Sequence, residues 1–450
     1  MSHGVTYGNT NLGQPGTDDR LIAGARKIIA HVAEHLRADL SIQLWNGEVV
    51  PLGPGARDDI RIVIASPGVI GRLVRRPSLM TLFEVAVAGG IVIVGASPLE
   101  ALGRWEHLRA VGLVKALDRR LVMRAAWPFL FAREADDAAL GFGSRVRAVF
   151  GRGRDDAGMI AHHYDVSNAF YALFLDPEMQ YSSAVFADPT MLLADAQLAK
   201  LDLICRKLRL GPGTRMLDLG CGWGGLACHA AEHYGAQVHA ITLSREQLAG
   251  ARERVAQRGL EDRVTLELRD YRDLDQAEAY DAIAQIGMFE HVGIDNHDRH
   301  FATMHRLLTP HGLYLHQATT RRATHDLARF RRRTAYMAVI NRYIFPGGEL
   351  DYIGMTVTNL ERHGFEVRDV DSMREHYHLS LKAWSEALYA NRDAAVAEAG
   401  AARTRLWLLY LALSCTGFAR GVLCDFQTLA QKRQVGGSGL PLDRGSLYAR

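Results

Sequence analysis

A glycine-rich segment between a strand pattern and a helix pattern is the feature that most constrains the fold of this chain. It reads Asp218-Leu-Gly-Cys-Gly-Trp-Gly-Gly225, and its first two residues end the strand pattern of residues 214–219. Gly220, Gly222 and Gly225 have the G-x-G-x-x-G spacing, in which missing side chains let the backbone approach a nucleotide-like ligand closely. A loop of this kind belongs at the carboxyl edge of a parallel sheet.

Strand and helix patterns alternate around this loop. We expect strands over 214–219, 237–242, 264–268, 282–286 and 313–316, and helices over 226–234 and 244–258. Ser244 and Gln247 have the spacing of a capping box at the start of the second helix. The alternation predicts an α/β fold with a doubly wound, mostly parallel sheet.

Residues 1–140 predict a smaller α+β domain. A helical pattern covers residues 20–40, and Asn46-Gly47 joins two short strand patterns as a hairpin. Residues 141–158 are rich in glycine and arginine and predict a basic linker, either a solvated loop or a docking strip for anionic lipid or the other domain. Residues 159–450 then form the main domain.

Composition excludes several classes of protein. Lys and Arg total 53 and Asp and Glu total 50, a balance too even for a dedicated nucleic-acid binder. The five cysteines have no C-x-x-C spacing, so we expect no disulfide framework, no metal site and a reducing, cytoplasmic location. No apolar stretch approaches the roughly 20 residues of a bilayer span, so we expect any membrane contact to be peripheral.

Two details refine the glycine loop. Asp218 precedes Gly220 by two residues, where a cationic amino-acid amine could be held. The second strand ends in Ile241-Thr-Leu-Ser244, without the acidic residue that an NAD site uses for its ribose. This combination resembles the S-adenosylmethionine loop of class I methyltransferases.

Four further segments carry a closer resemblance. They are His163-Tyr-Asp-Val-Ser-Asn168, Gln180-Tyr-Ser-Ser183, Ile286-Gly-Met-Phe-Glu-His-Val-Gly293 and Tyr343-Ile-Phe-Pro-Gly-Gly348. Their order and spacing resemble the cyclopropane-fatty-acyl-phospholipid synthase family, which includes mycolic-acid cyclopropane synthases and fatty-acid methyltransferases. The resemblance implies a seven-stranded methyltransferase sheet and S-adenosylmethionine as cofactor. Carried over by position, it implies a cofactor site of Tyr181, Ser182, Asp218, Gly220, Gly222, Thr242, Gln247, Asp270, Tyr271 and Arg272.

The implied reaction adds a one-carbon unit to a double bond. An alkene is a weak nucleophile, so it must be held close to the methyl donor. Aromatic faces can stabilise the resulting carbocation on the acyl chain without reacting with it. We expect Phe289, His291 and Tyr343 in this substrate pocket, with the role of His291 open. The other aromatic candidates, each also a plausible core residue, are Phe345, Tyr377 and Tyr410.

In the family, a bound bicarbonate accepts the released proton. Glu290 and Tyr410 match its pocket, whereas Ser183 replaces a cysteine and Gln317 stands where a histidine is expected. His316 is adjacent to Gln317, but successive residues of a strand face opposite sides. The two changes leave open whether the product is a cyclopropane or a methyl- or methylene-branched chain.

Two segments suggest how a lipid is reached. Arginines at 321–322 and 329–333 are expected on a surface helix, either solvated or seated on anionic head groups. Residues 406–413 are expected as a buried helix that lines an acyl tunnel and presents Tyr410.

The leading hypothesis is a cyclopropane synthase that acts on unsaturated phospholipid acyl chains at the inner membrane face. Branched-chain formation, small-amine N-methylation and non-catalytic lipid binding are the alternatives. We expect no nucleic-acid partner, and homodimerisation is left open.

Overall fold

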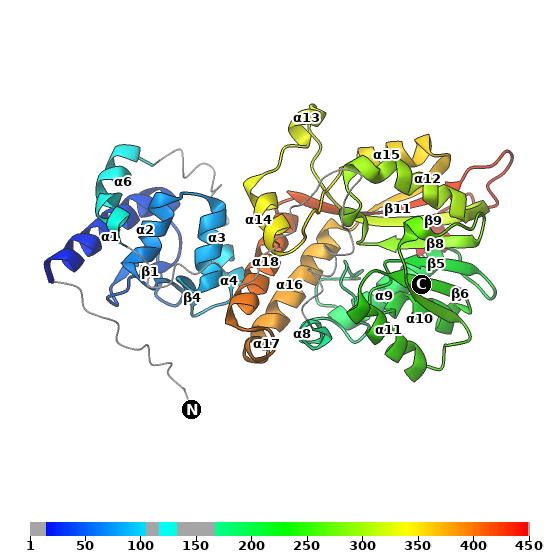
Figure 1. Cartoon of the computed structure of the whole chain (residues 1–450), viewed down its shortest axis with the longest axis horizontal. Coiled ribbons are helices and arrows are strands. Elements are labelled where there is room, and N and C mark those ends of the chain that lie inside the picture. Colours follow the sequence, from blue (N-terminus) through cyan, green and yellow to red (C-terminus); the bar gives the residue numbers. More distant parts are fainter. Residues whose placement is uncertain (1–14, 105–116, 133–166, 449–450) are drawn as a thin grey trace. The chain divides into compact units, whose positions relative to one another are not determined.

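The computed structural model describes residues 15–104, 117–132 and 167–448. The chain divides into two compact units, Met1–Gly141 and Phe142–Arg450, and each is considered by itself (Figure 1). The linker expected at 141–158 lies outside the described residues. In the described ranges, no helix has both the length and the apolar character needed to span a bilayer.

A small mixed sheet organises the first unit. Its strands are β1 (Ser41–Gln43), β2 (Val49–Pro51), β3 (Arg61–Ile64) and β4 (Ile91–Val94), in the order β2-β1-β3-β4. β1 and β2 pair antiparallel across the Asn46-Gly47 turn, as predicted, and Ile42 lies opposite Val50. β1 is parallel to β3, and β4 is antiparallel to β3.

Helices complete this unit. They are α1 (Pro15–Leu36), α2 (Pro67–Arg75), α3 (Leu79–Ala88), α4 (Pro98–Gly103) and α6 (Arg119–Ala126), with the 3-10 helix η1 (Trp127–Phe131) after α6. α6 ends at Ala126, and a 3-10 helix follows it, because Pro128 has no N–H to donate within an α-helix. Phe129 of η1 is fully buried in the core with Leu40 and Leu44.

The second unit contains a seven-stranded sheet, which confirms the predicted fold class. Its order is β10-β11-β9-β8-β5-β6-β7. The parallel strands are β5 (Arg215–Leu219), β6 (Gln237–Thr242), β7 (Val264–Leu268), β8 (Tyr280–Ile286) and β9 (Leu308–Arg321). β11 (Leu423–Lys432) runs antiparallel between β9 and β10 (Phe365–Ser372). β10 and β11 were not predicted from the sequence; in β11, buried Asp425 and Gln427 interrupt the apolar pattern.

Alternate residues of the strands build two separate cores. Met216 and Ala282 pack on one face with α9 (Leu193–Lys207), α10 (Gly225–Tyr234) and α11 (Arg245–Gln257). Leu217 and Ile283 pack on the other face with α12 (His297–Leu307) and α15 (Ile353–Arg362). Figure 1 shows helices on both sides of this sheet. The two-residue period of the strands therefore produces the doubly wound architecture.

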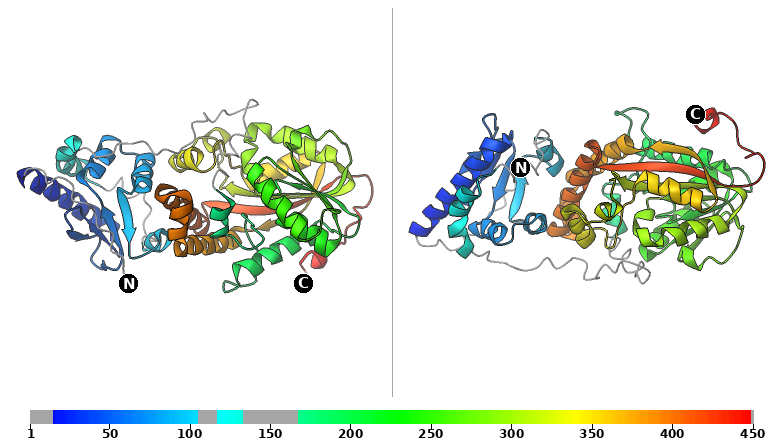
Figure 2. Two further views of the ribbon diagram at one scale, coloured as in Figure 1. Left: turned by 60° about the horizontal axis from the view of Figure 1, so that its bottom comes forward. Right: turned by 90° about the horizontal axis from the view of Figure 1, so that it is seen from above.

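Further helices follow at the C-terminal half of this unit. They are α13 (Leu327–Phe330), α14 (Ala335–Tyr343), α16 (Arg374–Ala390), α17 (Arg392–Ala399), α18 (Ala401–Ala419) and α19 (Gly445–Tyr448). α16 and α18 lie side by side (Figures 1 and 2). The buried helix expected at 406–413 is part of α18. The arginine-rich segment does not form the expected surface helix, because β9 extends to Arg321 and α13 is only 4 residues long.

Residues 178–180, which precede Tyr181-Ser182-Ser183, are held against α11 and against the start of α10. The Glu178 carboxylate accepts hydrogen bonds from Arg254 of α11 (2.9 Å) and from Arg258 just after that helix (2.6 Å). A Cβ atom at Gly225 would lie 2.6 Å from the Glu178 carbonyl oxygen and 2.3 Å from Gln180 Nε2. Gly225 is therefore the glycine that admits this loop, rather than one that admits a ligand.

Gly225→Ala tests this contact. Alanine favours a helix by about 1 kcal/mol over glycine, but the overlap with Glu178 should outweigh that gain and destabilise the protein by about 1–3 kcal/mol. Thermal unfolding measures the difference. Gly211→Ala is the control, because its Cβ would meet nothing within 4 Å. Equal stability of the two variants would contradict the close approach.

Candidate cofactor and active site

A cavity lies at the carboxyl ends of β5, β6 and β8 and is roofed by the loop of residues 179–182. Other described residues of its lining include Lys200, Trp223, Met288 and Asn296, none of which the sequence analysis singled out. All the residues expected to hold the cofactor line this one cavity: Tyr181, Ser182, Asp218, Gly220, Gly222, Thr242, Gln247, Asp270, Tyr271 and Arg272.

The glycine loop forms the narrow floor of the cavity. Gly220 and Gly222 have φ angles of +79° and +55°, which side chains disfavour. The Gly220 and Cys221 N–H groups both donate to the Ile241 carbonyl at 3.0 Å, so the loop is tied to β6. A Cβ at Gly220 would lie 3.1 Å from the Met288 side chain, which would have to shift to admit it.

Asp218 supplies a buried carboxylate to this cavity. It is 3% exposed, and burial raises its pKa to about 7, opposed by the positive charge of Lys200. Its Oδ2 atom has no hydrogen-bond partner within the described part of the chain. A cationic amine would satisfy that atom, so the site fits the amino-acid end of S-adenosylmethionine.

The cap of α11 fixes two more lining residues. The Gln247 N–H donates to Ser244 Oγ at 3.2 Å, which is one half of the predicted capping box; the other half does not form, because the Ser244 N–H donates to Thr242 instead of the Gln247 side chain. Thr242 Oγ1 donates to Gln247 Oε1 at 2.9 Å and accepts from the Ser244 N–H at 3.1 Å. Thr242 and Gln247 are thereby held side by side at the carboxyl end of β6.

The opposite wall combines an aromatic ring with an ion pair. Both the N–H and the Nε–H of Arg272 donate to Asp270 Oδ1 at 2.9 Å. The Arg272 guanidinium lies 6.0 Å from the Tyr271 ring centroid, and the Tyr271 ring meets His300 edge-on at 5.1 Å. The Tyr271 ring is thus braced on two sides, as a wall for a planar base requires.

Two acids lie together behind the cavity. Glu290 Oε1 accepts from the Thr319 N–H at 2.6 Å, and Thr319 Oγ1 lies 3.4 Å from Asp425 Oδ1. Burial raises the pKa of Glu290, and burial together with the charge of Glu290 raises that of Asp425 to about 7. The sequence analysis missed Asp425, although an acid within an otherwise buried strand is a usable signal.

The altered positions of the expected bicarbonate pocket are occupied by internal hydrogen bonds. Gln317 Nε2 donates to Asp425 Oδ2 at 2.7 Å, and Gln317 Oε1 accepts from Gln427 Nε2 at 2.9 Å. Ser183 Oγ donates to the Ala184 carbonyl at 3.1 Å. Both side chains are therefore engaged with this protein's own polar groups.

Aromatic side chains connect the cavity to α18. The hydroxyl groups of Tyr181 and Tyr410 are 3.4 Å apart. The Phe345 ring meets Tyr410 at 5.9 Å and His291 at 5.5 Å, both edge-on, and His291 also lines the cavity. Tyr343 is buried beside the Arg342 guanidinium and is not part of the cavity lining. Phe345 does not line the cavity either, but it contacts His291, which does.

Phe289 lies elsewhere than expected, whereas His316 faces the side opposite to Gln317, as the alternation of strand residues predicts. Their rings are 4.5 Å apart in the core under α12, where Phe289 also packs on His297 at 4.3 Å. The His316 Nδ1 atom lies 2.9 Å from Gln285 Oε1. This core is on the β9 face opposite to Gln317, because neighbouring strand residues point to opposite sides. Neither residue is retained in the candidate site.

Tyr377 also belongs to the packing of the helices. Its ring lies 4.5 Å from that of Phe418 and 6.0 Å from that of Trp384, between α16 and α18. The core alternative that was open for Tyr377 therefore agrees with its position.

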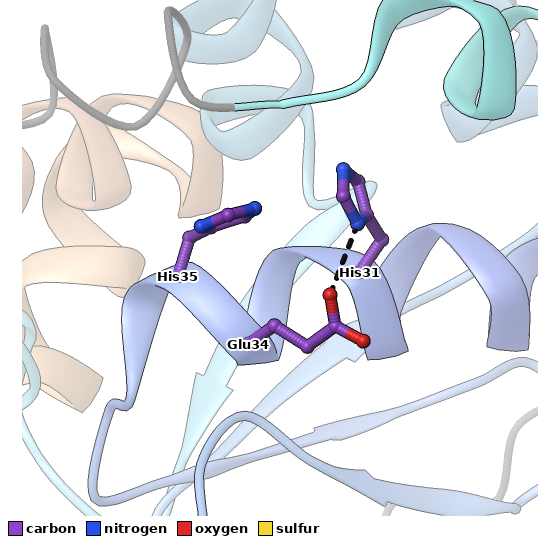
Figure 3. Close-up of side chains that lie close together, drawn as sticks. All are labelled: His31, Glu34 and His35. Carbon is purple, nitrogen blue, oxygen red and sulfur yellow. Dashed lines mark hydrogen bonds and ion pairs between the residues drawn. The ribbon is translucent and has the colours of Figure 1, made fainter.

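A histidine-rich cluster on α1 has a structural explanation. His31, Glu34 and His35 follow H-x-x-E-H spacing, and their potential ligand atoms lie close together (Figure 3). The Asp118 N–H donates to His31 Nε2 at 2.8 Å, which leaves the proton on Nδ1 for Glu34 at 3.2 Å. Both ring nitrogens of His31 are in use, so we assign no metal to the cluster.

Asp218→Asn separates the binding role of this carboxyl from its effect on stability. The raised pKa means that the folded chain holds this proton more tightly than the unfolded chain. Ionisation therefore lowers stability as the pH rises from about 4 to about 7. At pH 8 the variant should be more stable without ligand by about 1 kcal/mol or more.

The same variant should bind S-adenosylhomocysteine about ten-fold more weakly or worse, because it loses a charged partner for the amine. Calorimetry measures the affinity. Asp281→Asn on the adjacent strand is the control, since Asp281 pairs with Arg215 at 3.0 Å away from the cavity. Unchanged affinity of the Asp218 variant would exclude the amine contact.

Comparison with known proteins places the chain in a family. Residues 152–428 match the family model described as mycolic acid cyclopropane synthetase. A probable fatty acid methyltransferase of Pseudomonas putida is 38% identical over 92% of this chain and 98% of its own length. The cyclopropane-fatty-acyl-phospholipid synthase of Escherichia coli K12 is 41% identical over 51% of this chain and 56% of its own.

A solved structure agrees with the fold and with the cofactor. The mycolic acid cyclopropane synthase CmaA1, determined with SAH and CTAB, is 34% identical and superposes with a TM-score of 0.57 over 61% of this chain and 98% of that protein. The expected cofactor class is therefore supported by a related structure as well as by the cavity. The chain belongs to the mycolic acid cyclopropane synthetase family and is an S-adenosylmethionine-dependent methyltransferase.

Proposed function

We propose that this enzyme adds a one-carbon unit to the double bond of an unsaturated phospholipid acyl chain and leaves a branch rather than a ring. The observation that carries the branch assignment is the engagement of Gln317, whose amide is bonded to both Asp425 and Gln427. The bound cofactor supplies an electrophilic methyl group. The residues of this chain must then orient the alkene, shield the positive charge and accept a proton.

The aromatic residues between the cavity and α18 suit the shielding role. Tyr410 and Phe345 present faces that stabilise a cation on the acyl chain and offer no strong nucleophile to trap it. Trp407 packs against Tyr410 at 5.7 Å and supports it from the helix. A carbocation must also be protected from nucleophiles, a requirement that methylation of a small amine does not share.

The fate of the proton decides the product. Loss of a proton from the added methyl group with ring closure gives a cyclopropane. If a hydride first shifts from the methylated carbon to its neighbour, loss of the same proton gives a methylene branch. A bicarbonate base would need polar partners that Ser183 and Gln317 already use internally. We therefore assign proton acceptance to Glu290, whose Oε2 atom has no hydrogen-bond partner in the described part of the chain, whereas both Asp425 oxygens already accept from Gln317 and Thr319.

Relatives of both product classes support the general reaction. The relative aligned over 92% of this chain is named a probable fatty acid methyltransferase, whereas the named cyclopropane synthase aligns over 51%. Cyclopropane formation, the leading hypothesis from the sequence, remains the alternative outcome of the test below.

Purified enzyme with S-adenosylmethionine and vesicles of defined unsaturated phospholipids tests the reaction. We expect a branched product and less than about a two-fold change in turnover when bicarbonate is removed. Proton NMR is required, because a cyclopropane and a methylene branch have equal mass. Upfield cyclopropane resonances, or activity that depends on bicarbonate, would contradict the branch assignment. Methylation of small amines but not of lipid would contradict the substrate class.

We also propose that α6 and η1 dock the enzyme on an anionic membrane at the inner face. Met123, Trp127 and Phe131 are 70%, 62% and 75% exposed, and the Trp127 and Phe131 rings are 6.3 Å apart. Arg120 and Arg124 are exposed on the same helical face. Aromatic rings favour the membrane–water interface, and each arginine adds about 1 kcal/mol of attraction to anionic lipid.

Replacement of Trp127 and Phe131 together by alanine tests this surface. We expect sedimentation with anionic phosphatidylglycerol vesicles to fall about ten-fold or more, because two interfacial rings are lost. The control replaces Leu192 and Val422, which are 70% and 60% exposed in the other unit. Equal vesicle binding by both double variants would overturn the proposal. It would also be overturned if the Trp127 and Phe131 double variant lost self-association of the protein but kept its binding to vesicles.

A further inference from the structure

Two lysines of the second unit are buried to the same extent but differ in the groups that surround their ammonium. Lys200 is 0% exposed and Lys207 is 1% exposed. Lys207 lies 3.0 Å from Asp371 and 3.5 Å from Asp369, so its charge is neutralised by carboxylates. A buried charge without such a partner costs several kcal/mol, and the partner of Lys200 therefore has to be found.

Within residues 15–104, 117–132 and 167–448, the hydrogen-bond acceptors that contact Lys200 are neutral. Its ammonium donates to Gln180 Oε1 and, at 3.1 Å, to Ser182 Oγ. In the described part of the chain it forms no ion pair with a carboxylate. Asp176, Asp218 and Asp425 act on it at longer range, and burial lowers its pKa to about 8. Lys200 also lines the cofactor cavity.

The cavity thus contains one buried cation and one buried carboxyl that face a common space. Among the residues that the structure describes, the Asp218 Oδ2 atom has no hydrogen-bond partner and Lys200 has no ion-pair partner. The amino-acid end of S-adenosylmethionine carries an ammonium and a carboxylate on the same carbon. These two charges have the signs needed to neutralise Asp218 and Lys200.

We propose that Lys200 binds the carboxylate of the cofactor's amino-acid end, either directly or through the Ser182 hydroxyl that it contacts. Asp218 binds the ammonium, so Asp218 and Lys200 together recognise both charges of the zwitterionic amino-acid end. The inference rests on the S-adenosylmethionine site and is independent of the lipid substrate and the product. It makes Lys200 a specificity residue against adenosine compounds that lack the amino-acid end.

Calorimetry with two ligands tests the assignment. S-Adenosylhomocysteine has the amino-acid end, whereas 5′-methylthioadenosine lacks it. Lys200→Met should weaken S-adenosylhomocysteine about ten-fold or more, as expected for a lost charged contact, and change 5′-methylthioadenosine by less than about two-fold. Lys207→Met is the matched control, and it should lower the Tm without changing the ratio of the two affinities.

The wild-type protein provides a second test that does not depend on folding of a variant. Decarboxylated S-adenosylhomocysteine, which retains the amine, should bind about ten-fold more weakly than the parent compound or worse. Equal affinity for the two, or equal weakening of both adenosine ligands by Lys200→Met, would overturn the inference. Failure of the wild type to bind S-adenosylhomocysteine at all would instead contradict the cofactor site.

Discussion

Desolvation of opposite charges at one edge of the sheet is the constraint on which this structure depends. Asp218 and Lys200 are both buried in the wall of the cavity and are therefore removed from water. Within the described residues, no ion pair compensates the buried charge of Lys200. Such burial lowers the stability of the empty protein and raises the gain on ligand binding. The glycine loop, the roof over it and the cap of α11 all hold residues around these two charges.

Patterns in consecutive residues predicted those parts of the fold that depend on short-range interactions. The strand period, the glycine loop and the Ser244 cap are written in consecutive residues, and the structure has them where expected. β11 was missed because its interior is polar: Asp425, Gln427 and Thr428 are buried by pairing with β9 and α9 rather than by hydrophobicity. A pattern search for apolar strands cannot find an element stabilised in this way.

The site shows a similar division. Residues on the strand-to-helix turns were placed together by sequence spacing and resemblance. The position of Phe289 was predicted wrongly. It is adjacent to Glu290 in sequence, but beyond the end of a strand adjacency does not determine the direction of a side chain. Lys200 carries a signal that was overlooked: it falls on the same helical stripe as Ala196 and Leu203, both buried. A charge on an apolar stripe indicates either an internal partner or a ligand.

The Arg75 guanidinium determines how firmly the exposed rings of the first unit are mounted. It donates to the carbonyl oxygens of Leu130 at 3.1 Å and Ala132 at 2.7 Å, at the end of η1. Phe129 between the two exposed rings is fully buried, which anchors the same turn from below. The backbone that carries the rings is thus ordered before any contact is made. Insertion of these rings into a lipid interface would consequently cost little conformational entropy, because the backbone that carries them is already ordered.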